Sequence, residues 1–193
     1  MGLGVLALKL QDPKPKAQSP HTVQRSSNCD TLFPVPKKLS HYDSQGSARM
    51  VDVSAKTKTA REAEASAFLR MKPEVLEALP ANPKGDPLEV ARLAGIMAAK
   101  RTSELIPMCH PLPLSHIDVH LRVCENGVAI SSKVKTTAET GVEMEALVAA
   151  GIAALTVYDM CKALDKGIEI RQLVLDRKSG GKSGHYSRNG KRK

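Results

Sequence analysis

The chain has 193 residues, a length that suits one domain with extensions. It contains no Trp, two Phe and three Tyr, so we expect an aliphatic, alanine-rich core. The formal net charge of +9 is uneven: residues 1–40 carry +4, residues 177–193 carry +7 and residues 41–176 carry −2. The electrostatic case for a nucleic-acid-binding domain therefore rests on the two tails alone.

The composition predicts three parts. Residues 1–40 mix Pro, Ser, Gln and Lys without periodicity and are expected to be a disordered or poorly ordered extension. Residues 41–185 form the predicted α+β domain, and residues 186–193 a basic tail. The four cysteines, which form no zinc-binding spacing, are expected to be free thiols in a reducing compartment, the cytoplasm. They are Cys29, Cys109, Cys124 and Cys161.

The first elements along the chain are short. Residues 50–55 alternate in polarity and predict an edge strand or a lead-in to the domain. Residues 59–71 give conflicting signals, because their Ala and Glu content favours a helix while their polarity has the two-residue period of a half-buried strand. Pro73 suits the first position of a short helix that runs to about Leu79.

The middle of the chain has clearer boundaries. Asp86 and Pro87 predict the N-cap and first residue of a helix that continues to about Leu105. Three prolines in residues 107–113 predict a rigid, irregular loop. The next two strands, residues 114–124 and 128–138, are joined by a hairpin turn.

The longest apolar stretch, residues 139–162, predicts the central helix. Thr140 and Glu143 match a capping box, so we expect the helix to begin there and to end near Gly167. No charged residue lies between Glu145 and Asp159, so protein should cover most of its circumference. The uncharged part has about half the length of a membrane span, so no membrane helix is expected.

With a last strand at residues 168–175, the order of elements predicts an α+β fold. It is a ferredoxin-like split βαβ sandwich, with an antiparallel sheet of about four strands and helices on one face. The uncovered sheet face and the alanine-rich helix both favour a homo-oligomer.

Two loop residues are candidates for chemistry. His110 lies in the proline-rich loop, where a histidine can act as an acid, a base or a ligand, or can simply stabilise the loop by a hydrogen bond. Lys84 precedes a helix N-terminus, which suits an anion such as phosphate, although an ordinary exposed lysine is the alternative. His116 and His120 lack a third zinc ligand, and no metal site is predicted.

Two further candidates lie near the end of the domain. Asp159 and Lys162 share one helix face and form either a surface ion pair or a proton-exchanging pair; their apolar helix argues against full exposure. The glycine-rich residues 178–184 are not a nucleotide-hydrolase loop, since Asp176 stands where a glycine is needed and no helix follows. They could still wrap an anion, with Lys178 and Lys182 supplying charge.

Eight segments, in order, resemble the molybdenum cofactor biosynthesis protein C family, the cyclic pyranopterin monophosphate synthases. The resemblance covers about residues 39–185, and the first 40 residues match nothing in it. Its segments are Met50–Lys56, Lys84–Asp86, Ala91–Ile96, Ala98–Thr102, Leu105–Leu112, Thr140–Ala146, Leu155–Lys162 and Lys178–Gly184. The family usually has Leu where Met108 stands, a mild apolar difference.

The resemblance implies an enzyme, a phosphorus–oxygen lyase of molybdenum cofactor biosynthesis. It would convert (8S)-3′,8-cyclo-7,8-dihydroguanosine 5′-triphosphate to cyclic pyranopterin monophosphate and pyrophosphate. The implied catalytic residues are Asp159, Lys84 and Lys162, and the need for proton transfers adds His110 as a catalytic candidate. The implied active-site and substrate-binding residues are Met108, Cys109, His110, Glu143, Met144, Glu145 and Arg61, and the charge of the substrate adds Lys178 and Lys182 of the glycine-rich segment.

The family also implies a hexamer of paired subunits with active sites at subunit interfaces, and a strand at residues 59–71. No metal or organic cofactor is required by the motifs, and Mg²⁺ accompanying the triphosphate is left open. Neither nucleic acid nor membrane is an expected partner. Two rival interpretations are a basic nucleic-acid-binding module, resting on the C-terminal charge, and an inactive structural subunit. Deleting residues 186–193 would separate the first rival from the enzyme, because only a nucleic-acid binder should lose salt-dependent affinity.

Overall fold

The computed structural model describes residue 41 and residues 45–188, all of which belong to one compact unit, residues 39–193. The expected N-terminal extension, residues 1–40, lies outside the described residues, as do residues 189–193 of the expected tail.

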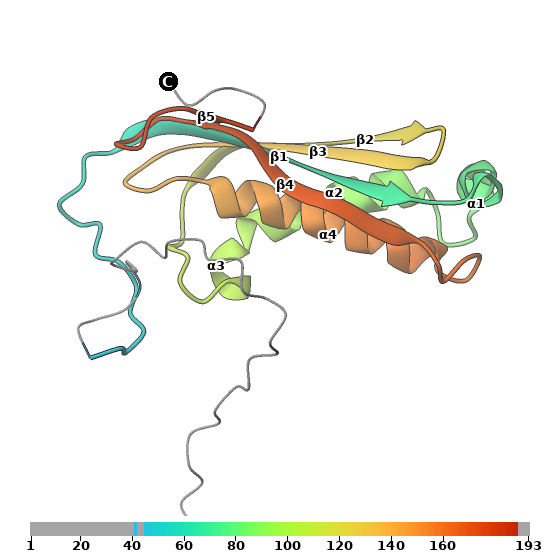
Figure 1. Ribbon diagram of the computed structural model, residues 1–193, viewed down its shortest axis with the longest axis horizontal. Helices are drawn as coiled ribbons and strands as arrows, with labels where there is room; N and C mark the ends of the chain where they lie inside the picture. The colour runs from blue at the N-terminus through green and yellow to red at the C-terminus, as the bar shows by residue number, and fades with distance from the viewer. Residues whose placement is uncertain (1–40, 42–44, 189–193) are drawn as a thin grey trace, which may run out of the picture. The chain divides into compact units, whose positions relative to one another are not determined.

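An antiparallel five-stranded sheet carries the helices α2 and α4 on one face (Figure 1), in agreement with the predicted α+β class. The strand order is β2-β3-β1-β4-β5. The strands are β1 (Thr59–Arg70), β2 (Leu114–Cys124), β3 (Gly127–Ala138), β4 (Glu169–Ser179) and β5 (Tyr186–Ser187). The fifth strand, which pairs with the end of β4, is formed by the first two residues of the expected tail.

Residues 59–70 form strand β1, so the two-residue period in polarity, and not the helix propensity, predicted the structure of this segment. Ala63, Ala65, Ala67 and Leu69 alternate into the core, and β1 pairs with β3 without interruption from Thr59 to Arg70. Burial of one face against the helices therefore outweighs the helix propensity of Ala and Glu, because propensity is worth only tenths of a kcal/mol per residue.

The opposite face of the sheet is charged. Lys133 Nζ lies 2.9 Å from a carboxylate oxygen of Glu62 and 3.0 Å from one of Glu64, and Lys135 and Arg177 extend this network. The sheet face that carries no helices was expected to need cover from another subunit. It is instead lined by ion pairs and is stable in contact with water.

The helical segments are α1 (Pro73–Ala78), the 3₁₀ turn η1 (Leu79–Ala81), α2 (Pro87–Lys100), α3 (Thr102–Leu105) and α4 (Glu143–Cys161). The predicted cap of α2 is confirmed, because the Asp86 carboxylate accepts hydrogen bonds from the backbone N–H groups of Leu88 and Glu89. The predicted continuation to Leu105 is interrupted at Arg101, whose non-helical backbone (φ −113°, ψ 17°) separates α2 from α3.

Helix α4 lies against the sheet and provides much of the core. Its buried alanines are Ala146, Ala149, Ala150, Ala153 and Ala154. The small side chains allow close approach, and the Ser132 hydroxyl of β3 donates to the carbonyl of Ala146 at 2.7 Å. By length and composition α4 could cross a membrane, but half of its apolar window is buried within the protein.

The predicted capping box of α4 is wrong. Val142 is the N-cap and no side chain caps the helix, because the Glu143 carboxylate pairs with Lys178 Nζ at 2.8 Å instead of turning back to the backbone. The helix also ends at Cys161, before the expected Gly167. Residues 50–58 form turns and extended backbone, so they are a lead-in to β1 and not an edge strand.

Candidate active site

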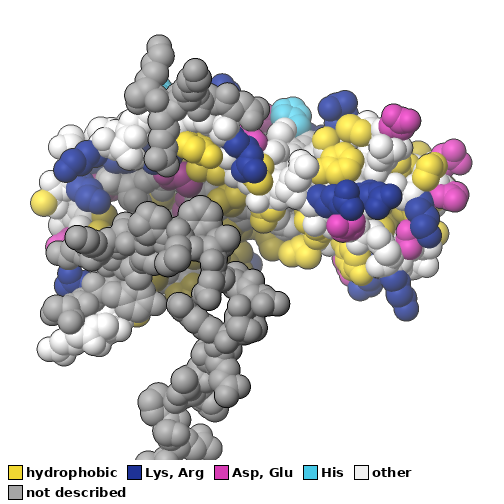
Figure 2. All heavy atoms as spheres, in the orientation of Figure 1, with side chains coloured by type: hydrophobic (Ala, Val, Ile, Leu, Met, Phe, Trp, Pro, Cys, Tyr) yellow, Lys and Arg dark blue, Asp and Glu magenta, His cyan; other side chains and the backbone are white. Residues whose placement is uncertain are grey.

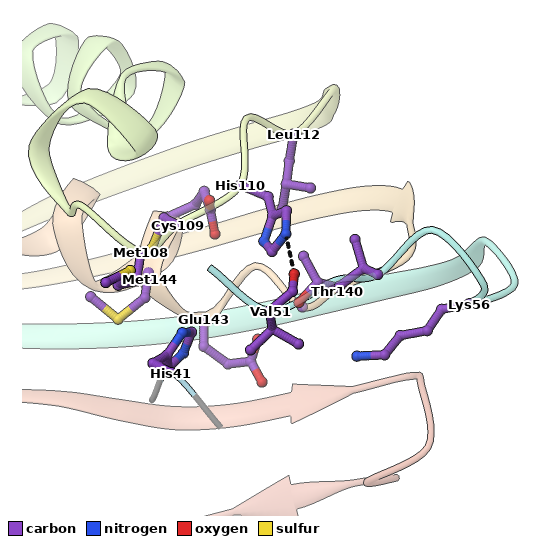
Figure 3. Close-up of a pocket in the computed structure, with 13 residues that line it drawn as sticks. His41, Val51, Lys56, Met108, Cys109, His110, Leu112, Thr140, Glu143 and Met144 are labelled. Carbon is purple, nitrogen blue, oxygen red and sulfur yellow. Dashed lines mark hydrogen bonds between the residues drawn. The ribbon is translucent and has the colours of Figure 1, made fainter. Parts of the chain in front are cut away.

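A first cavity lies beside the N-terminal end of α4 and the proline-rich loop. We call it the His110 pocket; it has a volume of about 370 Å³ (Figure 3). Its lining combines apolar and sulfur-containing side chains with two histidines, two carboxylates and a lysine: His41, Val51, Val53, Lys56, Met108, Cys109, His110, Leu112, Thr140, Gly141, Glu143, Met144 and Glu145. Such a mixed lining suits a flat ring system that carries polar edges.

The lead-in segment orients His110. Nε2 of His110 lies 2.8 Å from the backbone carbonyl oxygen of Val51, shown as the dashed line in Figure 3. A carbonyl only accepts, so Nε2 carries a proton and donates it to this bond, and Nδ1 is the ring nitrogen that the bond does not use. The loop-stabilising hydrogen bond weighed from the sequence is therefore present, and it leaves the other nitrogen for chemistry.

Glu145 is the buried acid of this pocket. It is 4 % exposed, and burial, together with the charge of Glu143, raises its pKa from the ordinary 4.5 to about 7. Burial and the nearby Glu145 also raise the pKa of the Cys109 thiol. At neutral pH Glu145 is thus present in both forms, and it can accept from or donate to a ring edge.

A second cavity adjoins the first. We call it the basic cleft; it has a volume of about 770 Å³ and includes side chains from the starts of β1 and α4 and from the glycine-rich segment. Its charged lining residues are Lys56, Arg61, Glu139, Glu143, Lys178 and Lys182. Thr140 and Gly141, together with Lys56 and Glu143, line both cavities and form their shared wall.

Arg61 and Lys178 have fixed positions in the cleft. Arg61 donates to the backbone carbonyls of Ala138 at 3.0 Å and Glu139 at 2.8 Å, so its charge is held without a carboxylate. Lys178 Nζ lies 2.8 Å from Glu143 and donates to the Ser183 hydroxyl at 2.7 Å. The cleft therefore keeps an excess of positive charge suited to a polyanion.

The glycines of the cleft are required by close approach. Gly180 has φ +90°, and a Cβ there would lie 2.2 Å from the carbonyl oxygen of Ala60. Gly181 has φ +73°, and a Cβ there would lie 2.0 Å from the guanidinium of Arg61. Only glycine lets this segment fold back over the start of β1.

A third group of residues lies at the C-terminal end of α4. Lys162 Nζ is 2.6 Å from Asp159 Oδ1, while Lys84 Nζ is 3.9 Å from Asp159 Oδ2 and 3.4 Å from the Asp159 carbonyl. The loop before α2 is tethered here, because the Asn82 side-chain amide donates to the carbonyl of Met160. We call Lys84, Asp159 and Lys162 the Asp159 cluster.

The Asp159 cluster is more exposed than the apolar helix suggested. The side chains of Asp159 and Lys162 are 60 % and 50 % exposed. The hydrogen bond and charge of Lys162, together with Lys84, lower the pKa of Asp159, and Asp159 raises the pKa of Lys162. Both are fully ionised at neutral pH in the single chain, so the expected partial burial and easy proton exchange are not met there.

One chain does not bring all the predicted site residues together. The His110 pocket and basic cleft contain nine of them: Arg61, Met108, Cys109, His110, Glu143, Met144, Glu145, Lys178 and Lys182. Asp159 and Lys162 lie at the other end of α4, and Lys84 lies beside them. Asp159 lies fourteen positions after Glu145 in the helix, a rise of about 21 Å.

The sequence alone did not single out Val51, Lys56 or Thr140 as site residues. Their only indication in the sequence was that they belong to Met50–Lys56 and Thr140–Ala146, two of the segments that resemble the family. Within residues 41 and 45–188, no group of three or more His, Cys, Asp and Glu residues is placed to hold a metal ion.

Fold and cavities define an α+β protein with a pocket of about 370 Å³ that shares a wall with a cleft rich in basic residues. Residues 50–181 match the MoaC family, and the chain belongs to that family. It is 56 % identical over 154 residues to a cyclic pyranopterin monophosphate synthase of Trichodesmium erythraeum, covering 78 % of this chain and 93 % of the relative. A cyclic pyranopterin monophosphate synthase of Nostoc sp. is 56 % identical over 160 residues, covering 79 % of this chain and 95 % of the relative. A cyclic pyranopterin monophosphate synthase of Roseiflexus sp. is 55 % identical over 152 residues, covering 77 % of this chain and 96 % of the relative.

Proposed function

We propose that the protein is a cyclic pyranopterin monophosphate synthase of molybdenum cofactor biosynthesis. Its substrate would be (8S)-3′,8-cyclo-7,8-dihydroguanosine 5′-triphosphate, and its products cyclic pyranopterin monophosphate and pyrophosphate. The names of relatives at about 55 % identity support the activity. The observation that carries the proposal is the ring-sized His110 pocket joined to the basic cleft, which matches a purine-type ring joined to a triphosphate.

In this proposal the ring system enters the His110 pocket. Met108, Cys109 and Met144 contact its apolar faces, while Glu145 accepts from the guanine-type donor edge. The triphosphate carries about four negative charges and lies in the basic cleft, where Arg61 and Lys182 supply charge that no carboxylate of residues 41 and 45–188 neutralises. The proposal includes no resident metal or organic cofactor, and Mg²⁺ would enter bound to the triphosphate.

The Asp159 cluster supplies the proton transfers. Lys162 and Lys84 lower the pKa of Asp159, so Asp159 is ionised and is in the form that can accept a proton, while Lys162 is the ammonium that can return one. Burial of the pair under substrate and a partner subunit would raise the pKa of Asp159 and lower that of Lys162, bringing both closer to neutrality. Lys84, held beside Asp159, adds the second positive charge that suits a phosphate.

Because the Asp159 cluster and the His110 pocket lie at opposite ends of α4, we propose that each complete site combines the two from paired subunits, in a hexamer. Apolar side chains on the surface support assembly, and Figure 2 shows such side chains between charged ones on one face. On α2, α4 and β4 they are Val90, Leu93, Met97, Leu155, Ile170 and Leu173. Residues 41–185 would be the catalytic domain, and the three described cysteines, all free, suit the cytoplasm.

The test is turnover by the purified protein, followed as pyrophosphate release and pterin formation. Asp159→Ala should lower kcat by about 100-fold or more, the scale of a lost proton-transfer group, while subunit assembly stays unchanged. Lys84→Ala should also lower activity, because it removes a positive charge beside the phosphate. Asp118→Ala is the matched control, since this carboxylate on β2, whose side chain is 41 % exposed, pairs with His120 and lines neither cavity. A wild-type protein that forms no pterin, or an Asp159→Ala variant with full turnover, would contradict the proposal.

A further inference from the structure

We infer that Lys56 is a further substrate-binding residue, which contacts the phosphate nearest the ring system, the one that the product keeps. This inference rests on the proposed function and adds to it a division of the phosphate contacts between two lysines.

Lys56 is placed between the two cavities. It lines both the His110 pocket and the basic cleft, and in Figure 3 its side chain points toward Val51 and Glu143. Of the residues in the shared wall, Thr140 and Gly141 are uncharged and Glu143 is acidic. Lys56 is thus the cation of that wall.

The charge of Lys56 is available to a ligand. Lys56 Nζ forms no ion pair or hydrogen bond with another residue of the described ranges, 41 and 45–188, and the same holds for Lys182. By contrast, Lys178 Nζ is engaged by Glu143 at 2.8 Å, which also neutralises the acid of the shared wall. An anion at this wall therefore meets Lys56 without a competing carboxylate charge.

The backbone fixes where Lys56 stands relative to His110. The Lys56 N–H donates to the carbonyl of Val53 at 2.9 Å and closes a turn, and the carbonyl of Val51 in the same segment holds His110. A single short segment therefore orients the candidate base and places the Lys56 side chain on the same pocket.

The shape of the ligand then assigns the phosphate. A ring in the His110 pocket and a triphosphate in the basic cleft must cross the shared wall at the first phosphate. Lys182 lines the cleft but not the pocket, so it contacts the two distal phosphates that leave as pyrophosphate. Loss of Lys56 should therefore weaken the binding of both the substrate and the cyclic product. Loss of Lys182 should instead weaken the binding of the substrate and of pyrophosphate.

The experiment compares inhibition by the two products. For Lys56→Ala we expect KM and the inhibition constant of cyclic pyranopterin monophosphate to rise about tenfold or more, the scale of one charge-assisted contact, with the inhibition constant of pyrophosphate unchanged. For Lys182→Ala the inhibition constant of pyrophosphate should rise instead. Lys56→Arg, which keeps the charge, should restore most of the affinity for cyclic product.

Lys58→Ala is the matched control. Lys58 is two residues further along, is 69 % exposed, pairs with Glu139 at 3.8 Å and lines neither cavity, so its removal should leave all three constants unchanged. Circular dichroism and sedimentation of each variant verify folding and assembly, and Lys56→Gln replaces Lys56→Ala if the latter fails either measurement.

Unchanged constants for a folded Lys56 variant, or an equal loss of affinity for pyrophosphate, would overturn the assignment of Lys56 while leaving the proposed function intact. Absence of turnover in the wild-type protein would instead refute the proposed function itself.

Discussion

Glu145 illustrates how burial changes the chemistry of a single residue. It belongs to the first turn of α4, where carboxylates are common because they favour the helix dipole, yet it is 4 % exposed and faces the pocket. Desolvation disfavours its charged form, and the resulting pKa of about 7 makes the stability of the protein depend on pH.

Glu145→Gln should stabilise the protein at high pH. The unfolded chain releases this proton near 4.5 and the folded chain near 7, so between these values the folded state binds more protons and stability falls as pH rises. Glutamine removes the cost of ionising a buried carboxylate. The free energy of unfolding of the variant should therefore exceed the wild-type value by up to about 3 kcal/mol above pH 7, and this difference should vanish toward pH 4.5. Chemical denaturation at pH 5 to 8 measures it.

Glu125→Gln is the control for the pH experiment, because Glu125 lies exposed in the hairpin turn between β2 and β3. Its difference from wild type should stay flat across the same pH range. A flat difference for Glu145→Gln as well would show that Glu145 titrates near its ordinary value.

At the scale of elements, the glycine-rich segment between β4 and β5 shapes one wall of the basic cleft. Gly180 and Gly184 both have positive φ, at +90° and +63°, but only Gly180 closely approaches another backbone. The pair therefore separates the cost of a left-handed backbone from the cost of a steric clash.

Gly180→Ala should destabilise the protein more than Gly184→Ala. Both pay for alanine in the left-handed region, about 1–3 kcal/mol, but at Gly180 the new Cβ would also meet the carbonyl oxygen of Ala60 at 2.2 Å, whereas nothing lies within 4 Å at Gly184. We expect Gly180→Ala to cost at least about 1 kcal/mol more in denaturant unfolding. Equal costs would mean that β1 and this segment are not in close contact.

At the scale of the whole molecule, α4 divides the candidate site. Its N-terminal end carries Glu143 and Glu145 into the two cavities, and its C-terminal end carries Asp159 and Lys162, about 21 Å away by helical rise. A rigid helix cannot bring its own ends together, so the proposed chemistry requires a second subunit.

Mixing two inactive variants tests this requirement. Subunits of Asp159→Ala and His110→Ala, exchanged or expressed together, should regain about a quarter of wild-type activity. Half of randomly formed pairs are mixed, and one of the two sites in each mixed pair combines an intact Asp159 cluster with an intact His110 pocket. Activity that stays at the level of the separate variants would show that paired subunits do not share the site.

Several features of this protein could be read from local sequence. Asp86 and Pro87 indicated the start of α2 because a cap needs only its neighbouring backbone groups. The alternation in residues 114–124 identified β2, on whose apolar face Val119 is buried and Ile117 and Leu121 are half-buried. The ordered motifs identified the family and the candidate residues, since those motifs are contiguous stretches of chain.

Tertiary structure decided the rest, where the deciding partner is distant in the chain. Burial against α4 made residues 59–70 a strand, and Lys178 drew Glu143 away from the predicted cap. Lys56 lies between the two cavities because its segment and the start of α4 together form their shared wall. Local sequence determines caps, periods and motifs because their energies are local; which side chains meet, and how much water they keep, is set by packing between segments far apart in sequence.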